Sequence, residues 1–320
     1  MTGWLRLARW SDWSTSKLPF LGAVALLLAP RALGLLPALA MLATVLFWAA
    51  FGYGINDVAD EASDHRAGKA NRAASLSPAS RLFFLGLTSS MTLLLTTVWA
   101  SDRVAPILVL AGLVLSAAYS LPPVRFKGRG AVGLVAGAVS QWLLPVLALS
   151  AVVVNGWTAP VTWCLGSLGL AIGIRWMAVH QLQDEASDRI SGVQTYVTRG
   201  GSAWPILVGA FVLELALLST TFWLTWPQSL LPAAVLAFWV AQQRWMRPRG
   251  LPFLEKLKSY DEAPLAEYYF LLLPLALALA RASSSPTFLV IAALFVSLGW
   301  CYVSLMSGQW REVWGIAPRS

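Results

Sequence analysis

Apolar blocks of about 15 to 23 residues recur along most of this 320-residue sequence and constrain its fold more than any other feature. Three clear examples are 35–54, 104–121 and 203–226. A helix of this length is about 30 Å long, which matches the hydrocarbon thickness of a bilayer. Only 12% of the residues are charged, whereas soluble domains carry about 25%. The sequence therefore predicts an all-α integral membrane protein.

The number of apolar blocks sets the expected number of membrane-spanning helices. Ten blocks can be distinguished, at 17–30, 34–54, 83–100, 104–121, 131–153, 160–182, 203–226, 228–243, 267–281 and 286–306. Ten spans leave both termini on one side, and nine spans result if one block enters the membrane without crossing it. No short apolar region followed by a small-residue cleavage site opens the sequence, so we expect no removable signal peptide. We predict a single transmembrane domain over residues 1–320.

The basic residues are distributed unevenly between the two sides of such a protein. If both termini lie in the cytoplasm, Arg31, Arg103 and Arg281 are on the outer side and Arg175 lies within a helix. The remaining 19 of the 23 Lys and Arg residues are then cytoplasmic. This asymmetry fixes the orientation by the positive-inside rule, and it accounts for the basic excess without a nucleic-acid partner. We expect a multi-pass protein of the cell inner membrane that contacts membrane lipid.

Two short stretches, 56–64 and 184–188, hold seven of the fifteen acidic residues. Each stretch lies at the cytoplasmic end of an expected helix. Residues four apart are rotated by only about 40° around a helix, so each stretch presents its polar groups on one face. These groups are Asn56, Asp57, Asp60 and Asp64 in the first stretch and Asp184 and Asp188 in the second.

Carboxylates gathered at the cytoplasmic mouth of a membrane protein repel one another unless cations lie between them. Oxygen ligands favour Mg²⁺, which commonly also binds substrate phosphates. We therefore expect these six residues to bind Mg²⁺ together with a diphosphate substrate. The alternative is that they are ordinary acidic residues at solvated helix ends. Both stretches contain Asp-Glu-Ala-Ser-Asp and both are on the same side of the membrane, which disfavours that alternative.

The loops after two of the expected helices, 65–72 and 119–129, are basic. The first loop contains Lys69 and Arg72, and the second contains Arg125 and Lys127. A diphosphate held by Mg²⁺ still exposes oxygens, and Lys or Arg can stabilise the charge that grows on it as a leaving group. These four residues are therefore candidates for diphosphate binding. Equally, cytoplasmic loops are basic because they set the topology and meet anionic lipid.

Three motifs in this order resemble those of the UbiA superfamily of intramembrane prenyltransferases. They are N-D-x-x-D-x-x-x-D at 56–64, Y-S-x-P-P-x-R-x-K at 119–127 and D-x-x-x-D-x-x-x-G-x-x-T at 184–195. The resemblance covers about residues 5 to 280. The opening sequence 9–13 is similar to the R-P-x-x-W start of the family, with tryptophan where proline is usual.

The resemblance implies a UbiA-type bundle of nine to ten transmembrane helices around a central cavity that is open to lipid at the side and has a cytoplasmic cap. It also implies transfer of a prenyl group from a prenyl diphosphate to an aromatic or other lipophilic acceptor, through an allylic carbocation. By motif match, the six acidic-stretch residues bind two or more Mg²⁺ ions with the diphosphate, which Arg72 and Lys127 contact directly. The expected catalytic residues are Asp60, Tyr119, Lys127, His180 and Asp184.

Two alternative functions follow from the same residues. Some UbiA-type proteins are terpene cyclases, in which the alkenes of the substrate itself quench the cation at the same metal site. The acidic stretches would otherwise serve ion handling in a transporter or lipid-binding scaffold. Transporters carry their binding site near the middle of the bilayer, whereas both acidic stretches here lie at helix ends. The transferase is the preferred interpretation.

The chain departs from the family pattern at two places. His180 stands where many members carry an acidic residue, on the same helical face as Asp184. It is a candidate metal ligand, acceptor-binding residue or general base, or else a hydrogen-bonded structural histidine. Residues 69–73 read K-A-N-R-A where the quinone-forming branches show K-P-x-R-P, which disfavours those branches. The long loop 244–267 is expected to cover the site as part of the cap, or to lie on the membrane surface.

Two charged residues, Arg175 and Glu214, are expected deep within the bilayer. Arg175 is nine residues before Asp184, so it points to the opposite face of its helix. Glu214 lies at a similar depth on the next helix. Because an unpaired charge is costly in the membrane, we predict a buried ion pair between them. We also expect Tyr53 and Tyr119 to border the reacting carbon.

Overall fold

The structure, a computed structural model, describes residues 3–9, 13, 17–28, 34–152, 158–246, 257–258, 265–266, 268–282, 287, 290 and 293. These residues form helices joined by turns, with one isolated β-bridge between Gly130 and Thr195. The first helix, α1 (Gly3–Leu7), is short. The all-α class predicted from the apolar blocks is confirmed.

Five helical segments in the described part of the chain are long and apolar enough to cross a membrane. They are α4 (Leu35–Arg66), α5 (Pro78–Trp99), segment 131–152, α9 (Pro160–Ser191) and α10 (Ala203–Leu224). Segment 131–152 is a succession of α7 (Ala131–Ala138), the π-helical turn η3 (Val139–Leu143), α8 (Leu144–Leu149) and the 3₁₀ turn η4 (Ser150–Val152). The shorter apolar helices are α3 (Lys17–Leu28), α6 (Val104–Ser120), α11 (Leu230–Met246), and the π-helical turn η6 (Tyr268–Leu272) followed by α13 (Leu273–Ala282).

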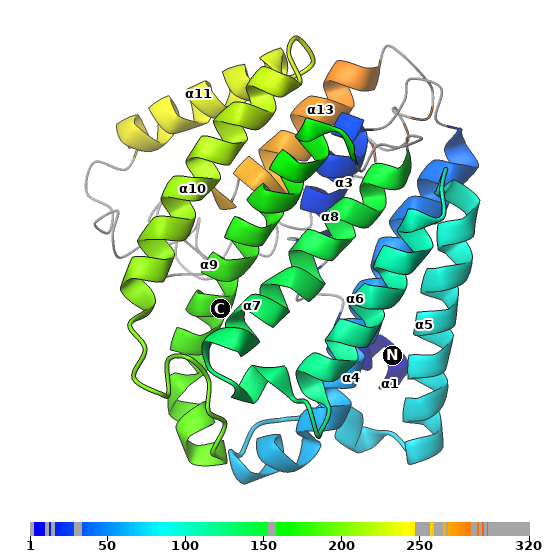
Figure 1. Cartoon of the computed structure of the whole chain (residues 1–320), viewed down its shortest axis with the longest axis vertical. Coiled ribbons are helices and arrows are strands. Elements are labelled where there is room, and N and C mark those ends of the chain that lie inside the picture. The colour runs from blue at the N-terminus through cyan, green and yellow to red at the C-terminus, as the bar shows by residue number, and fades with distance from the viewer. Residues whose placement is uncertain are drawn as a thin grey trace, which may run out of the picture.

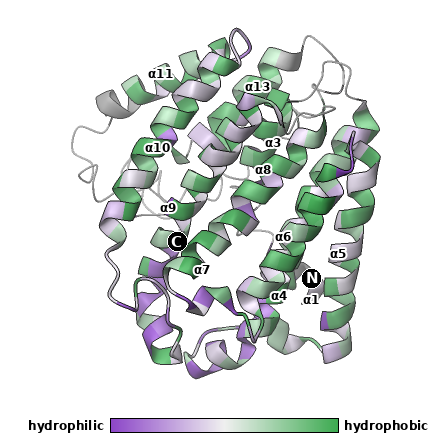
Figure 2. Cartoon of the chain, in the orientation of Figure 1, coloured by the Kyte–Doolittle hydropathy of each residue, from purple (hydrophilic) through white to green (hydrophobic). Residues whose placement is uncertain are grey.

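Each of the first nine expected apolar blocks coincides with one of these helices. The tenth block, 286–306, and most of the loop 244–267 lie outside the described residues. The helices run along one another as a bundle (Figure 1). Hydrophilic residues gather at one end of it (Figure 2). We call this end, which comprises residues 56–72, 119–130 and 180–199, the motif end.

Helices α4 and α9 continue well past their apolar parts, and this continuation carries both acidic stretches. Each is 32 residues long and has no proline near the motif end to interrupt it. Each stops just after its acidic stretch because a glycine there adopts a left-handed backbone, with φ of +67° at Gly68 and +75° at Gly192. The sequence thus projects both acidic stretches beyond the apolar part of the bundle on rigid helices.

Glycines allow the helices to approach closely where the packing is tightest. A Cβ atom added to Gly112 on α6 would lie 2.1 Å from the ring of Trp48 on α4, and one added to Gly173 on α9 would lie 2.6 Å from Trp142. No hydrophobic effect drives helices together in lipid, so their association depends on close packing. Small residues permit it, because the side chain of one helix can lie against the backbone of another. The two tryptophans are thereby held in fixed orientations at the centre of the bundle.

The predicted ion pair between Arg175 and Glu214 is confirmed. Both side chains are fully buried, on α9 and α10, with Nε of Arg175 2.6 Å from Oε1 of Glu214 and Nη2 2.9 Å from Oε2. The guanidinium also lies 5.6 Å from the ring centroid of Trp176 and 5.9 Å from that of Phe211. The two hydrogen bonds and the flanking aromatic rings stabilise both charges where water does not reach them.

We expect Arg175→Met alone, or Glu214→Leu alone, to destabilise the protein by about 3–5 kcal/mol, since each leaves one charge buried and unpaired. The double variant Arg175→Met/Glu214→Leu should recover most of this loss, because it removes both charges. The measurement is thermal unfolding in detergent together with the yield of folded protein. Arg189→Met, which removes one partner of the exposed pair between Arg189 and Glu185 on the same helix, is the matched control and should cost at most about 1 kcal/mol. A double variant less stable than both single variants would contradict this account.

Candidate active site at the motif end

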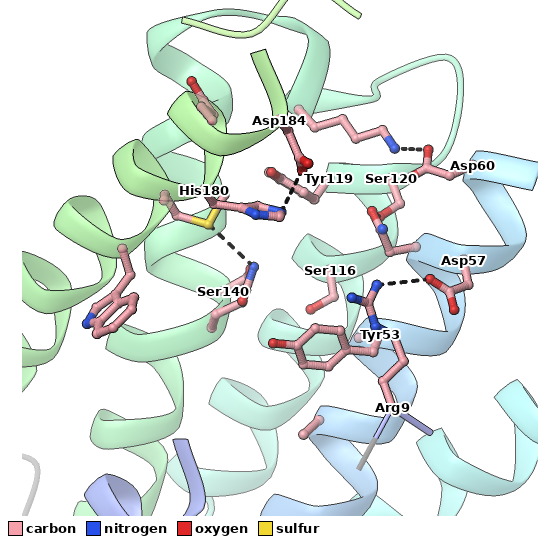
Figure 3. Close-up of a pocket in the computed structure, with 18 of the residues that line it drawn as sticks. Arg9, Tyr53, Asp57, Asp60, Ser116, Tyr119, Ser120, Ser140, His180 and Asp184 are labelled. Atoms are coloured by element: carbon pink, nitrogen blue, oxygen red, sulfur yellow. Dashed lines mark hydrogen bonds and ion pairs between the residues drawn. The ribbon is translucent and has the colours of Figure 1, made fainter. Parts of the chain in front are cut away.

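A cavity of about 670 Å³ opens between the helices at the motif end. Its walls come from α3, α4, α6, the turn η3, α8, α9 and η6. The part nearest the motif end is lined by the acidic and basic residues, and further in the walls become aromatic, with Trp48, Trp142, Trp176 and Phe270. In Figure 3, Asp57 and Asp60 on α4 lie across the cavity from His180 and Asp184 on α9. The fold therefore brings the two acidic stretches to opposite sides of one space.

On the α4 side, Asp57 is the most deeply buried carboxylate of the first acidic stretch, at 4% exposed. Its Oδ1 accepts from Nη1 of Arg9 at 3.1 Å, whereas its Oδ2 is buried and has no hydrogen-bond partner among the described residues. The amide nitrogen of Asn71 donates to Oδ2 of Asp64 at 2.7 Å and to the backbone carbonyl of Asp57 at 2.8 Å. Asn71 therefore folds the loop after α4 back onto the helix that carries the motif.

Asp60 receives its cations from the loop after α6. The ammonium of Lys127 donates to Oδ1 of Asp60, and Nη2 of Arg125 lies 3.4 Å from the same oxygen. Lys127 is in the 3₁₀ turn η2 (Phe126–Gly128), against which α7 packs so closely that a Cβ on Gly133 would lie 2.3 Å from the carbonyl oxygen of Phe126. Burial lowers the pKa of Lys127 to about 8, against the opposite effect of the Asp188 and Asp57 carboxylates.

The α9 side is connected to the α4 side by a lysine. Nζ of Lys69, from the loop after α4, donates to Oδ1 of Asp184 at 3.0 Å. On the same helix, Nε2 of His180 lies 3.4 Å from Oδ2 of Asp184, one turn away. The side-chain oxygen of Gln181 accepts from the backbone N–H of Tyr196 at 3.0 Å, which holds the loop after α9 against its own helix. Of these contacts, the pair between Lys69 and Asp184 joins the second acidic stretch to the loop that follows the first.

The charges that line the cavity balance. The described lining residues include five carboxylates, Asp57, Asp60, Asp64, Asp184 and Asp188, and five cations, Arg9, Lys17, Lys69, Arg72 and Lys127. Four of these carboxylates contact a Lys, Arg or Asn side chain: Asp57 contacts Arg9, Asp60 contacts Lys127, Asp64 contacts Asn71 and Asp184 contacts Lys69. Within the described residues, no three Asp, Glu, His or Cys side chains converge as a metal site. An all-oxygen set of carboxylates nevertheless suits Mg²⁺, and the partnerless Oδ2 of Asp57 is a buried acceptor that a cation would satisfy.

The structure brings nearly all of the residues predicted from the sequence to this cavity. Lining it are Asn56, Asp57, Asp60, Asp64, Lys69, Arg72, Tyr119, Lys127, His180, Asp184 and Asp188, and also Tyr53. Arg125 is the exception, since it reaches Asp60 without forming part of the wall. Tyr53 and Tyr119 both line the cavity, and that they border the reacting carbon stays a prediction.

Sequence reasoning missed three lining or supporting residues. Lys17 was counted only as a topological charge, Gln141 lies inside an apolar block, and Asn71 lies in a loop read only for its basic residues. Placing the charge of Lys17 or the amide of Gln141 in lipid costs free energy. That cost could have indicated from the sequence that both side chains face the protein interior. Their contacts depend on tertiary packing.

Comparison with known proteins identifies the chain's relatives. The model of the UbiA prenyltransferase family matches residues 18–253. No curated protein matches. A UbiA homologue from Archaeoglobus fulgidus bound to GPP and Mg²⁺ is 18% identical, with a TM-score of 0.61 over 95% of this chain and 100% of that one. A homologue from the same organism bound to DMAPP and Mg²⁺ is 17% identical, with a TM-score of 0.56 over 95% and 99%.

A further solved structure, of digeranylgeranylglyceryl phosphate synthase, is 16% identical, with a TM-score of 0.51 over 93% of this chain and 98% of that one. At such identities the solved structures establish the fold, a UbiA-type helical bundle of an integral membrane protein. The family match extends over well more than half of the chain, and it includes all three motifs found in the sequence. The chain belongs to the UbiA prenyltransferase family.

Proposed function

We propose that the protein transfers a prenyl group from a prenyl diphosphate to a lipophilic or aromatic acceptor, in a reaction that depends on Mg²⁺. The observation that carries this proposal is the division of one cavity into a charged mouth and an aromatic interior. The mouth suits a diphosphate with its metal ions, and the interior suits an isoprenoid chain. The solved relatives bound to GPP or DMAPP with Mg²⁺ support the same donor class.

The acidic residues of the two stretches would hold the metal, with Asn56, Asp57, Asp60 and Asp64 on one side and Asp184 and Asp188 on the other. We propose two or more ions, bound together with the diphosphate. When bound, Mg²⁺ supplies Lewis-acid stabilisation of the leaving group. Lys69, Arg72 and Lys127 line the same mouth and would donate to the diphosphate oxygens, with Arg125 behind Asp60. Their charges stabilise the negative charge that develops as the bond breaks.

The reaction begins when the bond between C1 of the prenyl chain and the bridging oxygen breaks, and the electron pair leaves with the diphosphate. The allylic carbocation that forms needs a dry environment with electron-rich faces. Trp142, Trp176 and Phe270 line the inner cavity and provide aromatic rings there. The acceptor then donates an electron pair to C1 and loses a proton, which His180, beside Asp184, would take up. Tyr119 borders the same space.

Polar side chains in the inner cavity favour a transferase over a terpene cyclase. Lys17, Tyr53 and Gln141 lie among the lining residues on the inner side of the acidic stretches. A cyclase cavity holds only an apolar alkene chain, which an ammonium group cannot bind. A transferase cavity must also bind an acceptor, and an ammonium group can bind a polar one. The cyclase is the second candidate, since it uses the same metal and diphosphate groups.

We also propose that the motif end faces the cytoplasm. Many basic residues of the described part of the chain are at this end, including Arg66, Arg125, Arg129 and Arg199 in addition to the cavity cations Lys69, Arg72 and Lys127. Positive loops remain on the cytoplasmic side during insertion. Prenyl diphosphate would then enter from the cytoplasm and the lipophilic acceptor from the membrane.

The decisive test incubates the protein in detergent with Mg²⁺ and geranyl, farnesyl or geranylgeranyl diphosphate, with and without candidate acceptors. Diphosphate release and the organic extract are both analysed. We expect Asp60→Asn and Asp184→Asn each to lower turnover by at least about 100-fold, because each removes a charge from the metal-binding groups. The matched controls are the adjacent acidic residues. Glu61→Gln and Glu185→Gln should retain most of the activity, because Glu61 pairs with Arg81 and Glu185 with Arg189, outside the cavity.

The products distinguish the candidate functions. Product that forms only with an acceptor identifies a transferase, and a cyclic hydrocarbon or alcohol without acceptor identifies a cyclase. If the protein binds no prenyl diphosphate in the presence of Mg²⁺ and releases no diphosphate, the proposed function is wrong.

Because the cavity charges already balance, we expect metal and diphosphate to bind cooperatively. Divalent ions alone would add positive charge to a neutral site, whereas ions and diphosphate together largely neutralise each other. Titration with Mn²⁺, followed by electron paramagnetic resonance, should give an affinity at least about tenfold higher with inorganic diphosphate than without it. Asp60→Asn should lower this affinity and Glu61→Gln should leave it unchanged. Equal affinity with and without diphosphate would refute the cooperativity.

A further inference from the structure

The connection after α6 and the connection after α9 contact each other directly at the motif end (Figure 1). The backbone N–H of Gly130 donates to the carbonyl oxygen of Gln194 at 3.2 Å, and Gly130 and Thr195 form the isolated parallel β-bridge. Nη2 of Arg199 donates to the carbonyl oxygen of Gly128, also at 3.2 Å. We call these three contacts the loop clamp. It joins the turn η2 to a connection 71 residues further along the chain.

Gly130 is the residue that lets the two connections meet. Its backbone has φ of +59° and ψ of −127°, a conformation that residues with a side chain rarely adopt. A Cβ atom there would lie 3.3 Å from Cδ of Arg199 and 3.7 Å from its Nε. The side chain of Arg199 therefore packs against the backbone of Gly130 before it reaches the Gly128 carbonyl. The backbone conformation and this close approach both favour glycine.

The turn to which the clamp is attached carries Lys127, a cation of the cavity mouth. Lys127 is only 8% exposed, and its ammonium donates to Oδ1 of Asp60. A Cβ atom on Gly133 of α7 would lie 3.0 Å from the Cα of Lys127, so the turn is held from α7 as well. Arg125, just before the turn, has φ of +38°, which is strained for a residue other than glycine. Such strain persists only where surrounding contacts maintain it, and the loop clamp supplies such contacts.

The connection after α9 is in turn fixed to its own helix. The backbone N–H of Val193 donates to the carbonyl oxygen of Asp188 at 2.9 Å, and that of Tyr196 donates to the side chain of Gln181. The ring of Tyr196 lies against Gly201, where a Cβ atom would be 2.5 Å from it. The loop clamp therefore connects the turn η2 to the helix that carries the second acidic stretch.

We propose that Arg199 is a positioning residue that holds the ammonium of Lys127 at the cavity mouth. Arg199 does not line the cavity, so it acts through the Gly128 carbonyl and not on a substrate. Without this hydrogen bond the strained turn is less restrained, and Lys127 spends more time in solvent. The inference rests on the proposed function, which assigns Lys127 to the diphosphate, but the position of the side chain can be measured without any substrate.

The first measurement is the rate at which acetic anhydride acetylates Lys127 in the full chain in detergent, read by mass spectrometry. Lys69, an exposed lysine outside the clamp, is the internal reference. We expect Arg199→Met to accelerate acetylation of Lys127 relative to Lys69 by about 3- to 10-fold, as the loss of one hydrogen bond predicts. Arg199→Lys keeps a donor and should keep most of the protection. The control Arg189→Met, which removes the exposed pair with Glu185, should leave the ratio unchanged.

A pair of glycine variants tests the clamp without removing a charge. Gly130→Ala should accelerate acetylation of Lys127 at least as much as Arg199→Met, because alanine strains the backbone and crowds the Arg199 side chain. Gly128→Ala, two residues away, should have no such effect, since its Cβ atom would meet no atom within 4 Å and its φ is not positive. Unchanged acetylation of Lys127 in both Arg199→Met and Gly130→Ala would overturn the proposal.

The second measurement is the affinity for Mn²⁺ in the presence of inorganic diphosphate. Arg199→Met should lower this affinity in the wild-type background and have no further effect in a Lys127→Met protein, because both changes remove the same contribution. Additive losses would show that Arg199 acts independently of Lys127, which also overturns the proposal. If Lys127→Met leaves the affinity unchanged while Arg199→Met still exposes Lys127 to acetylation, the diphosphate role of Lys127 is wrong and its positioning by Arg199 is confirmed.

Discussion

Charge compensation at the border of an apolar medium is the constraint on which this structure depends. A helical bundle in lipid satisfies its backbone internally, but every charged side chain that it buries needs an opposite charge close by. Arg175 and Glu214 meet this need as a fully buried pair that does not line the cavity. The motif end meets it with many carboxylates and cations contributed by different segments. In the first case compensation serves packing, and in the second it forms the site where, in the proposed function, metal ions and a diphosphate would replace the internal partners.

Such an exchange would suit the placement of Lys69, Arg72 and Lys127 on connections between helices and of the carboxylates on helices. Helices α4 and α9 extend rigidly past their apolar parts, which fixes the spacing of the carboxylates. Lys69 and Lys127 belong to a loop and a short 3₁₀ turn, from which they reach Asp184 and Asp60. In the proposed reaction these lysines turn from the carboxylates to the diphosphate oxygens. Long side chains on short connections permit that change without movement of the helices.

The cavity also separates two chemical tasks by depth. In the proposed reaction, the Lys and Arg side chains at its charged mouth would stabilise the diphosphate as it leaves. Its aromatic interior would keep water from the cation in that reaction, and the close packing of glycines 112 and 173 holds two of its tryptophans in place. Lys17 interrupts this aromatic interior. Its ammonium donates to the hydroxyl oxygen of Tyr53 and to the side-chain oxygen of Gln141, so a charged residue lies among the aromatic walls.

Local rules were sufficient for the helices, the two acidic faces and the pairing of Arg175 with Glu214, because apolar length, helical periodicity and the cost of a buried charge act along one or two segments. Asn71, Gln141 and Lys17 show where such rules stop, since their partners are on segments distant in sequence. The sequence by itself determined an all-α membrane protein with two acidic helix ends. Only the tertiary structure decided which cation meets which carboxylate and that Lys17 lies against Tyr53 and Gln141, because those contacts depend on how helices pack around a shared cavity.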